Sequence, residues 1–134
     1  MFYPLQQTCA YRLAARFELP PGIDQLGSVR AISAETGETS WLHEQRAATY
    51  ALAATGGGLV FGGDGNGRFR AFDQESGDVL WEINLGSPVT GFPITYAVDG
   101  RQYVVASTGT RREGLTPELQ PSAGNNLFVF ALPN

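Results

Sequence analysis

The chain has 134 residues, of which 43% are hydrophobic and 16% are charged. This composition suffices for the core of one domain, and the charge is too low for a disordered chain. The nine basic residues are all arginines and are outnumbered by thirteen acids, which gives a net charge of −4 and argues against a nucleic-acid-binding protein.

Short apolar or alternating runs, bounded by Gly, Asp and Asn, predict β-strands along almost the whole chain. In chain order these strands are Phe2–Leu5, Val29–Ser33, Ser40–Leu42, Tyr50–Ala54, Leu59–Gly62, Arg68–Asp73, Val79–Asn84, Ile94–Val98, Gln102–Ser107 and Leu127–Leu132. Glycine-rich sequences between them are typical of hairpin turns, because glycine or asparagine can adopt a positive φ there. Two segments, starting at Cys9 and at Thr110, are expected to be long loops. The sequence therefore predicts an all-β protein.

An internal repeat shows how these strands are organised. Gly27–Trp41 and Gly67–Trp81 are copies of one another at an offset of forty residues. The identical pairs are Gly27/Gly67, Arg30/Arg70, Ala31/Ala71, Glu35/Glu75, Gly37/Gly77 and Trp41/Trp81. A period near forty that is built from short strands is the spacing of a β-propeller blade. Such repeats cannot bury their apolar faces alone and must stack on neighbours.

Each copy of the repeat offers a surface and a ring that could join neighbouring sheets. In the second copy Ala71 ends a strand, Gly77 makes the turn and Trp81 lies on the returning strand. The small alanine and the bare glycine leave a flat surface on which an aromatic ring of a neighbour could lie. Ala31, Gly37 and Trp41 are the equivalents in the first copy. We interpret both tryptophans as structural docking residues rather than as cofactor-stacking residues.

The pattern Ala-x-Asp-x-x-x-Gly-x-x-x-Trp at 71–81 resembles the tryptophan-docking motif of the quinoprotein dehydrogenases. These are eight-bladed propellers that use pyrroloquinoline quinone (PQQ) and calcium to oxidise alcohols. Segments 56–73, 91–96 and 99–104 resemble the last blades of the family in order, and residues 2–9 resemble the strand before them. Essentially the whole chain is covered, so the resemblance rests on several segments rather than on one motif.

The resemblance implies that the chain is the C-terminal quarter or so of such an enzyme. Residues 1–48 would form an incomplete blade, 49–88 a complete blade, and 89–134 a final blade that lacks its outer strand. In the family the beginning of the chain supplies that strand and closes the ring. The catalytic aspartate, the calcium ligands and the tryptophan beneath the quinone belong to earlier blades, so we expect the isolated chain not to be catalytic.

The resemblance also implies which residues surround the cofactor. Gln7 stands two residues before Cys9, where the family has an asparagine that faces the quinone. Thr49 and Tyr50 match an inner-strand segment near the cofactor, and Gly109 opens a loop that lines the central axis. After it come Thr110, Arg111 and Arg112, in place of the family's glycine-rich continuation; the arginines could pair with quinone carboxylates or lie solvated on a surface loop. Cytochrome c as electron acceptor and a periplasmic location follow from the same resemblance.

Two alternatives of other classes remain open. One is a non-catalytic propeller scaffold that mediates protein–protein interaction, like the propeller lipoproteins of outer-membrane assembly. The other is a small binding module that closes a ring by oligomerising, since exposed strand edges drive association. The segments 91–96 and 102–104 favour the dehydrogenase over the scaffold, and nothing in the sequence supplies a missing outer strand for the module.

Other sites are not predicted. Cys9 and His43 are the only cysteine and histidine, which excludes an internal disulfide and a His/Cys metal cluster. A Walker loop needs a lysine, and the sequence has none. The turn at 64–67 continues with Arg68, where a calcium loop needs another oxygen ligand. No run approaches the about eighteen apolar residues of a membrane span, and the first residues lack the pattern of a secretion signal.

Overall fold

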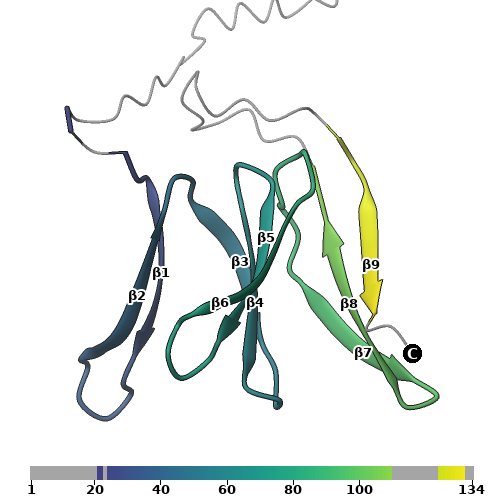
Figure 1. Ribbon diagram of the computed structural model, residues 1–134, viewed down its shortest axis with the longest axis horizontal. Helices are drawn as coiled ribbons and strands as arrows, with labels where there is room; N and C mark the ends of the chain where they lie inside the picture. Colours follow the sequence, from purple (N-terminus) through teal and green to yellow (C-terminus); the bar gives the residue numbers. More distant parts are fainter. Residues whose placement is uncertain (1–20, 23, 110–123, 132–134) are drawn as a thin grey trace, which may run out of the picture.

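The computed structural model describes residues 21–22, 24–109 and 124–131 of the chain. Figure 1 shows that they form three antiparallel sheets standing side by side. The first sheet has the order β1-β2, the second β3-β4-β5-β6 and the third β7-β8-β9. The strands are β1 (Gly27–Ile32), β2 (Thr39–Gln45), β3 (Thr49–Ala54), β4 (Leu59–Asp64), β5 (Arg68–Asp73), β6 (Val79–Asn84), β7 (Ile94–Val98), β8 (Arg101–Ser107) and β9 (Leu127–Ala131). The expected all-β fold class is confirmed.

The strand predictions agree closely with the structure. The predicted bounds of β5, β6 and β7 are those observed. β1 and β2 differ from their predicted bounds by one to three residues at both ends, and the other described strands by one or two residues at one end. The predicted strand Phe2–Leu5 lies outside the described residues, as does most of the loop that starts at Thr110. Nine of the predicted strands are therefore present in the described part of the chain.

β5 of the second sheet is buried on both faces, because its side chains alternate between two neighbouring sheets. Phe69 points toward the third sheet, where its ring lies 5.9 Å from that of Phe130. Phe72 points toward the first sheet, where its ring lies 6.4 Å from that of Trp41. Both phenylalanines are almost completely buried, at 0% and 1% exposure. Alternate side chains of one strand thus join all three sheets.

The turns of the two repeat copies have the same backbone geometry. Gly37 and Gly77 both adopt a positive φ, 75° and 78°, which glycine reaches without the steric cost of a side chain. Their amides donate hydrogen bonds to the carbonyls of Ser33 and Asp73, at 2.9 and 3.0 Å. The Asp73 carboxylate also accepts two turn amides, at 2.9 and 2.8 Å, and these backbone hydrogen bonds lower its pKa. Ser33 accepts one, from Thr36, at 3.2 Å.

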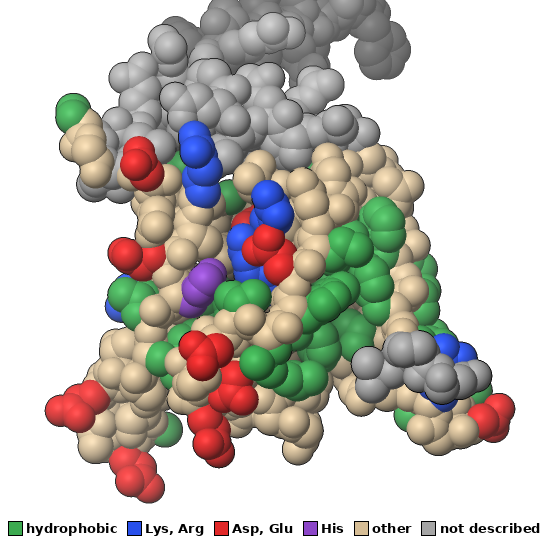
Figure 2. Space-filling model, in the orientation of Figure 1, with side chains coloured by type: hydrophobic (Ala, Val, Ile, Leu, Met, Phe, Trp, Pro, Cys, Tyr) green, Lys and Arg blue, Asp and Glu red, His purple; other side chains and the backbone are tan. Residues whose placement is uncertain are grey.

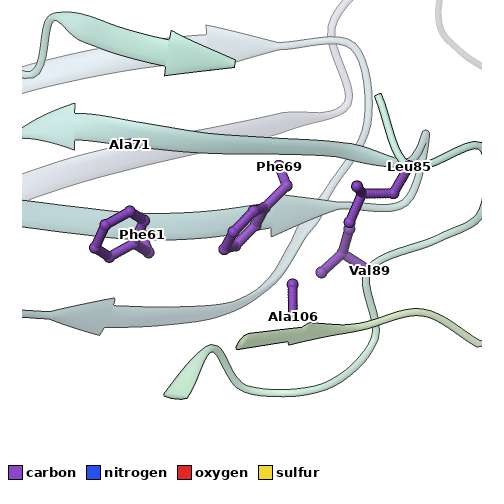
Figure 3. Close-up of a cluster of buried hydrophobic side chains, with 6 residues drawn as sticks. All are labelled: Phe61, Phe69, Ala71, Leu85, Val89 and Ala106. Atoms are coloured by element: carbon purple, nitrogen blue, oxygen red, sulfur yellow. The ribbon is translucent and has the colours of Figure 1, made fainter. Parts of the chain in front are cut away.

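The hydrophobic core lies between the second and third sheets. Figure 3 shows its buried side chains, which come from β4, β5, β8 and the segment after β6. They are Phe61, Phe69, Ala71, Leu85, Val89 and Ala106. Partly buried Leu59, Ile83, Val104, Phe128 and Phe130 pack around them. This interface is apolar, whereas the one between the first and second sheets combines an aromatic contact with an ion pair. Figure 2 shows hydrophobic side chains between the second and third sheets and charged side chains between the first and second.

Candidate functional site

Trp41 of β2 lies against the turn of the second sheet. A Cβ atom on Gly77 would lie 2.5 Å from Cδ2 and 2.6 Å from Cε3 of the indole, so the ring covers the bare glycine backbone. The indole Nε1–H donates a hydrogen bond to the Gln74 carbonyl at 3.0 Å. The ring of one repeat copy therefore rests on the turn of the other. Gly37, the counterpart of Gly77, has no atom within 4 Å of such a Cβ.

Trp81 lies in a different environment. Its ring meets Phe69 at 6.0 Å and Phe130 of the third sheet at 5.3 Å, both edge to face, and the residue is 39% exposed. The groove beside it has a volume of about 400 Å³. Its lining residues are Leu59, Phe61, Ala71, Trp81, Gln102, Val104, Phe130 and Ala131. In the described residues Trp81 thus contacts an aromatic ring of the next sheet rather than a turn glycine.

The alanines of the repeat lie in a different environment from the glycines. Ala71 is 5% exposed and belongs to the core between the second and third sheets. Trp41, by contrast, lies against the turn of the second sheet from the side of the first. Ala31 is half-buried and stands opposite Trp41 in the pairing of β1 with β2, as Ala71 stands opposite Trp81. The glycine, and not the alanine side chain, carries the contact with Trp41.

A buried charged cluster joins the first two sheets beside the tryptophan contact. Arg70 donates from Nη1 to Asp64 Oδ2 at 2.8 Å and to Gln45 Oε1 at 3.0 Å. Its Nε donates to Glu82 Oε2 at 2.6 Å. Asp64 is 2% exposed, and its other oxygen accepts the amides of Asn66 and Arg68, each at 2.9 Å. The guanidinium of Arg70 therefore has hydrogen-bond acceptors on three different strands, one of which belongs to the neighbouring sheet.

The sequence interpretation did not include this cluster, although the repeat contains a signal for it. Arg30 is the counterpart of Arg70, and Asp24 stands forty residues before Asp64. These two acids lie three residues before the repeat copies, so the offset of forty residues also relates an acid six residues before each arginine. This spacing indicates a structural ion pair. His43 lies next to this cluster, with its ring 5.1 Å from that of Phe72. Burial and the positive charge of Arg70 lower the pKa of His43, and Glu82 partly opposes them.

The predicted cofactor-lining residues that the structure describes lie at one end of the sheets. Thr49, the first residue of β3, is paired with Asp64, the last of β4. The Val89 amide donates to the Asp64 carbonyl at 3.1 Å, and Val89 bridges to Thr108, next to Gly109. This chain of contacts places Thr49 and Gly109 at the same end. Gln7 lies outside the described residues.

The side chains at this end are polar and half-buried. Thr49 Oγ1 accepts a hydrogen bond from the Gln45 amide at 2.6 Å, and Tyr50 follows it on β3. Both residues are half-buried, as is Gly109. The Gly109 amide donates to the Pro88 carbonyl at 2.9 Å, and a Cβ there would lie 2.6 Å from Thr90 Oγ1. The missing side chain of Gly109 thus leaves room for the Thr90 hydroxyl. Hydroxyl groups at this end can form part of the wall around a planar, polar cofactor.

Two classes of site are not seen in the described part of the chain. Residues 21–22, 24–109 and 124–131 contain no group of three His, Cys, Asp or Glu side chains placed to hold a metal ion. The same residues contain no helix long and apolar enough to cross a membrane.

Comparison with known proteins identifies the family. Residues 26–104 match the family model "Glucose/ethanol/alcohol dehydrogenase, beta-propeller domain". The chain is 41% identical over 120 residues to a quinoprotein ethanol dehydrogenase of Pseudomonas putida, covering 82% of this chain and 19% of that protein. It is 39% identical over 85 residues to methanol dehydrogenase [cytochrome c] subunit 1 of Methylorubrum extorquens, covering 63% and 14%.

A solved structure agrees. The fold superimposes on a europium-containing methanol dehydrogenase with a TM-score of 0.73 at 28% identity, covering 83% of this chain and 24% of that one. The chain spans about a fifth of the length of the ethanol dehydrogenase that it matches, with 19% covered. The chain therefore belongs to the PQQ β-propeller domain family of the quinoprotein alcohol and methanol dehydrogenases.

Proposed function

We propose that the chain forms the C-terminal part of the propeller of a PQQ-dependent alcohol dehydrogenase. The carrying observation is that residues 26–104 match the propeller family while their sheets stack through a tryptophan on a turn glycine. Residues 1–48 supply an incomplete blade, 49–88 a complete blade and 89–134 the final blade without its outer strand. The four strands of the second sheet and the three of the third support this division.

In this proposal the end of the sheets that holds Thr49, Tyr50 and Gly109 faces the quinone, together with Gln7. PQQ, when bound, supplies the acceptor for the two electrons of the alcohol. The threonine and tyrosine hydroxyls fit its carbonyl and carboxylate oxygens as hydrogen-bond partners. Gly109 leaves room for the Thr90 hydroxyl at the same end of the sheets. The side-chain amide of Gln45 donates a hydrogen bond from Nε2 to the Thr49 hydroxyl and holds it in position. Calcium is held by residues of other blades.

The proposed reaction of the parent enzyme is the oxidation of a primary alcohol in the periplasm, with electrons passed to cytochrome c. The names of the relatives support it, because they are a quinoprotein ethanol dehydrogenase and a cytochrome c-linked methanol dehydrogenase. The acid–base groups of the reaction belong to other blades, so the isolated chain with PQQ and calcium is expected to show no dye-linked alcohol oxidation.

A chimera tests the proposal. The segment of the Pseudomonas putida ethanol dehydrogenase that matches this chain is replaced by the chain, and dye-linked ethanol oxidation is measured with PQQ and calcium. We expect turnover within about tenfold of the parent, and a further loss of about tenfold, or about 1.4 kcal/mol, in a Thr49→Val chimera. A chimera that folds but does not turn over ethanol would refute the proposal and favour a scaffold. Turnover by the isolated chain would show that catalysis does not need the other blades.

A further inference from the structure

Gln45 joins the buried charged cluster to Thr49. It is the last residue of β2 and is 5% exposed. Its side-chain Oε1 accepts a hydrogen bond from Arg70 Nη1 at 3.0 Å. Its Nε2 donates to the Ala47 carbonyl at 2.7 Å and to Thr49 Oγ1 at 2.6 Å. The oxygen and both N–H groups of this buried amide are therefore used.

The charge of Arg70 determines which way this amide points. A guanidinium carries only hydrogen-bond donors, and Asp64 and Glu82 hold it in place at 2.8 and 2.6 Å. If the Gln45 amide were flipped, its NH₂ group would face the guanidinium and its oxygen would face the Ala47 carbonyl. Both contacts would bury polar groups without partners, which is unfavourable. The NH₂ group of Gln45 is therefore directed toward the start of β3.

This orientation decides what the Thr49 hydroxyl can offer. An N–H group cannot accept a hydrogen bond, so the Thr49 oxygen accepts from Gln45 through a lone pair, and its own proton points elsewhere. In the part of the chain that the structure describes, Thr49 Oγ1 donates to no acceptor. The residue is half-buried, at the end of the sheets that also holds Gly109. Its hydroxyl can therefore donate to a ligand at this end.

We propose that Gln45, oriented by Arg70, is a positioning residue that presents the Thr49 hydroxyl as a hydrogen-bond donor to an oxygen of the quinone. This inference rests on the proposed function, in which Thr49 faces PQQ. The carbonyl and ionised carboxylate oxygens of PQQ accept hydrogen bonds and do not donate them, so a hydroxyl with a directed proton complements them. Arg70 acts through the amide, because its own charge is paired with Asp64 and Glu82.

Titration of PQQ into the Pseudomonas putida chimera, with calcium present, measures this contact as a dissociation constant through the quenching of protein fluorescence. In Gln45→Glu the new carboxylate only accepts hydrogen bonds, so it takes the Thr49 proton away from the quinone. We expect the dissociation constant for PQQ to rise by about tenfold or more. In a Thr49→Val background the same substitution should change it by less than about twofold, because the hydroxyl is already gone. In a Thr49→Ser background the full effect should return.

Gln74→Glu is the matched control, since it makes the same chemical change at an exposed position in the β5–β6 turn. It should leave the dissociation constant unchanged. Far-UV circular dichroism checks that each chimera is folded. If Gln45→Glu unfolds, Gln45→Met replaces it; the Ala47 carbonyl, left without its donor, would then accept the Thr49 proton and lower the affinity in the same way.

The outcomes separate this inference from the proposed function. If the wild-type chimera binds PQQ but Gln45→Glu raises the dissociation constant equally with Thr49 and in the Thr49→Val background, or in neither, the inference is overturned and the proposed function stands. A folded wild-type chimera that does not bind PQQ would overturn both.

Proton NMR of the full chain without cofactor tests the orientation of the amide by itself. The two Nε2 protons of Gln45 should exchange slowly with solvent and show a nuclear Overhauser effect to the Thr49 Hβ proton. A flipped amide would bring these protons close to Arg70 instead, and that result would overturn the inference.

Discussion

Replacing Trp41 by alanine should strongly destabilise the contact between the first and second sheets. The substitution removes an indole that covers Gly77, stacks near Phe72 and donates a 3.0 Å hydrogen bond to the Gln74 carbonyl. Truncating a core tryptophan costs about 3–5 kcal/mol, and the half-buried Trp41 should lie near about 3 kcal/mol. That is a large part of the free energy of unfolding of a typical domain, which is about 5–15 kcal/mol. Urea unfolding followed by far-UV circular dichroism measures the loss.

A double-mutant cycle with Gly77→Ala shows whether the loss comes from this contact. In the wild-type background the new methyl group would displace the indole, because its Cβ would lie 2.5 Å from Cδ2. In the Trp41→Ala background only the strain of a positive φ remains. Gly77→Ala should therefore cost less unfolding free energy there than in the wild-type background, by about 1 kcal/mol or more. Additive effects, or a Trp41→Ala chain within about 0.5 kcal/mol of the wild type, would refute the docking role of this ring.

Three further predictions concern the contacts around the second sheet, and urea unfolding tests each of them. Asp64→Asn removes a 2% exposed partner of a buried ion pair and should cost about 3 kcal/mol, whereas Glu82→Gln at the partly exposed end should cost about 1 kcal/mol or less. Burial and a neighbouring arginine lower the pKa of His43 below 6.5, so the folded state binds fewer protons than the unfolded state; stability should fall as the pH drops below 6.5, and His43→Gln should flatten that part of the profile. Gly63→Ala would force a methyl group into the Val89 side chain and should lower the free energy of unfolding by about 1–3 kcal/mol. In a Val89→Ala background the same substitution should cost much less. Equal losses in both backgrounds would contradict this packing.

Much of the fold could be predicted from the sequence because the strands are short and their turns are marked by glycine. Gly37 and Gly77 fix the positive φ that the hairpins need, and hydrophobic alternation fixes which side chains share a face. The repeat of forty residues indicated that the sheets stack as similar units. These are local signals, and they correspond to the described strands closely.

The contacts between sheets were harder to predict, because they depend on how one sheet is placed against the next. The interpretation gave Ala71 a share in a docking surface, but its side chain lies in the core with Phe61 and Phe69. The ion pair of Arg70 with Asp64, which lies within the second sheet, was not predicted either, nor was the hydrogen bond from Arg70 to Gln45, which forms only when the first sheet lies against the second. Strand periodicity determines which face a residue occupies and leaves its partner undetermined.

The most direct test of the account is a crystal structure of the Pseudomonas putida chimera with PQQ bound. We expect this segment to form the last sheets of the ring, with Trp41 against Gly77 and with Thr49, Tyr50 and Gly109 lining the quinone chamber. A ring in which the segment packs outside the propeller, or in which those three residues lie on the outer wall away from the quinone, would contradict it.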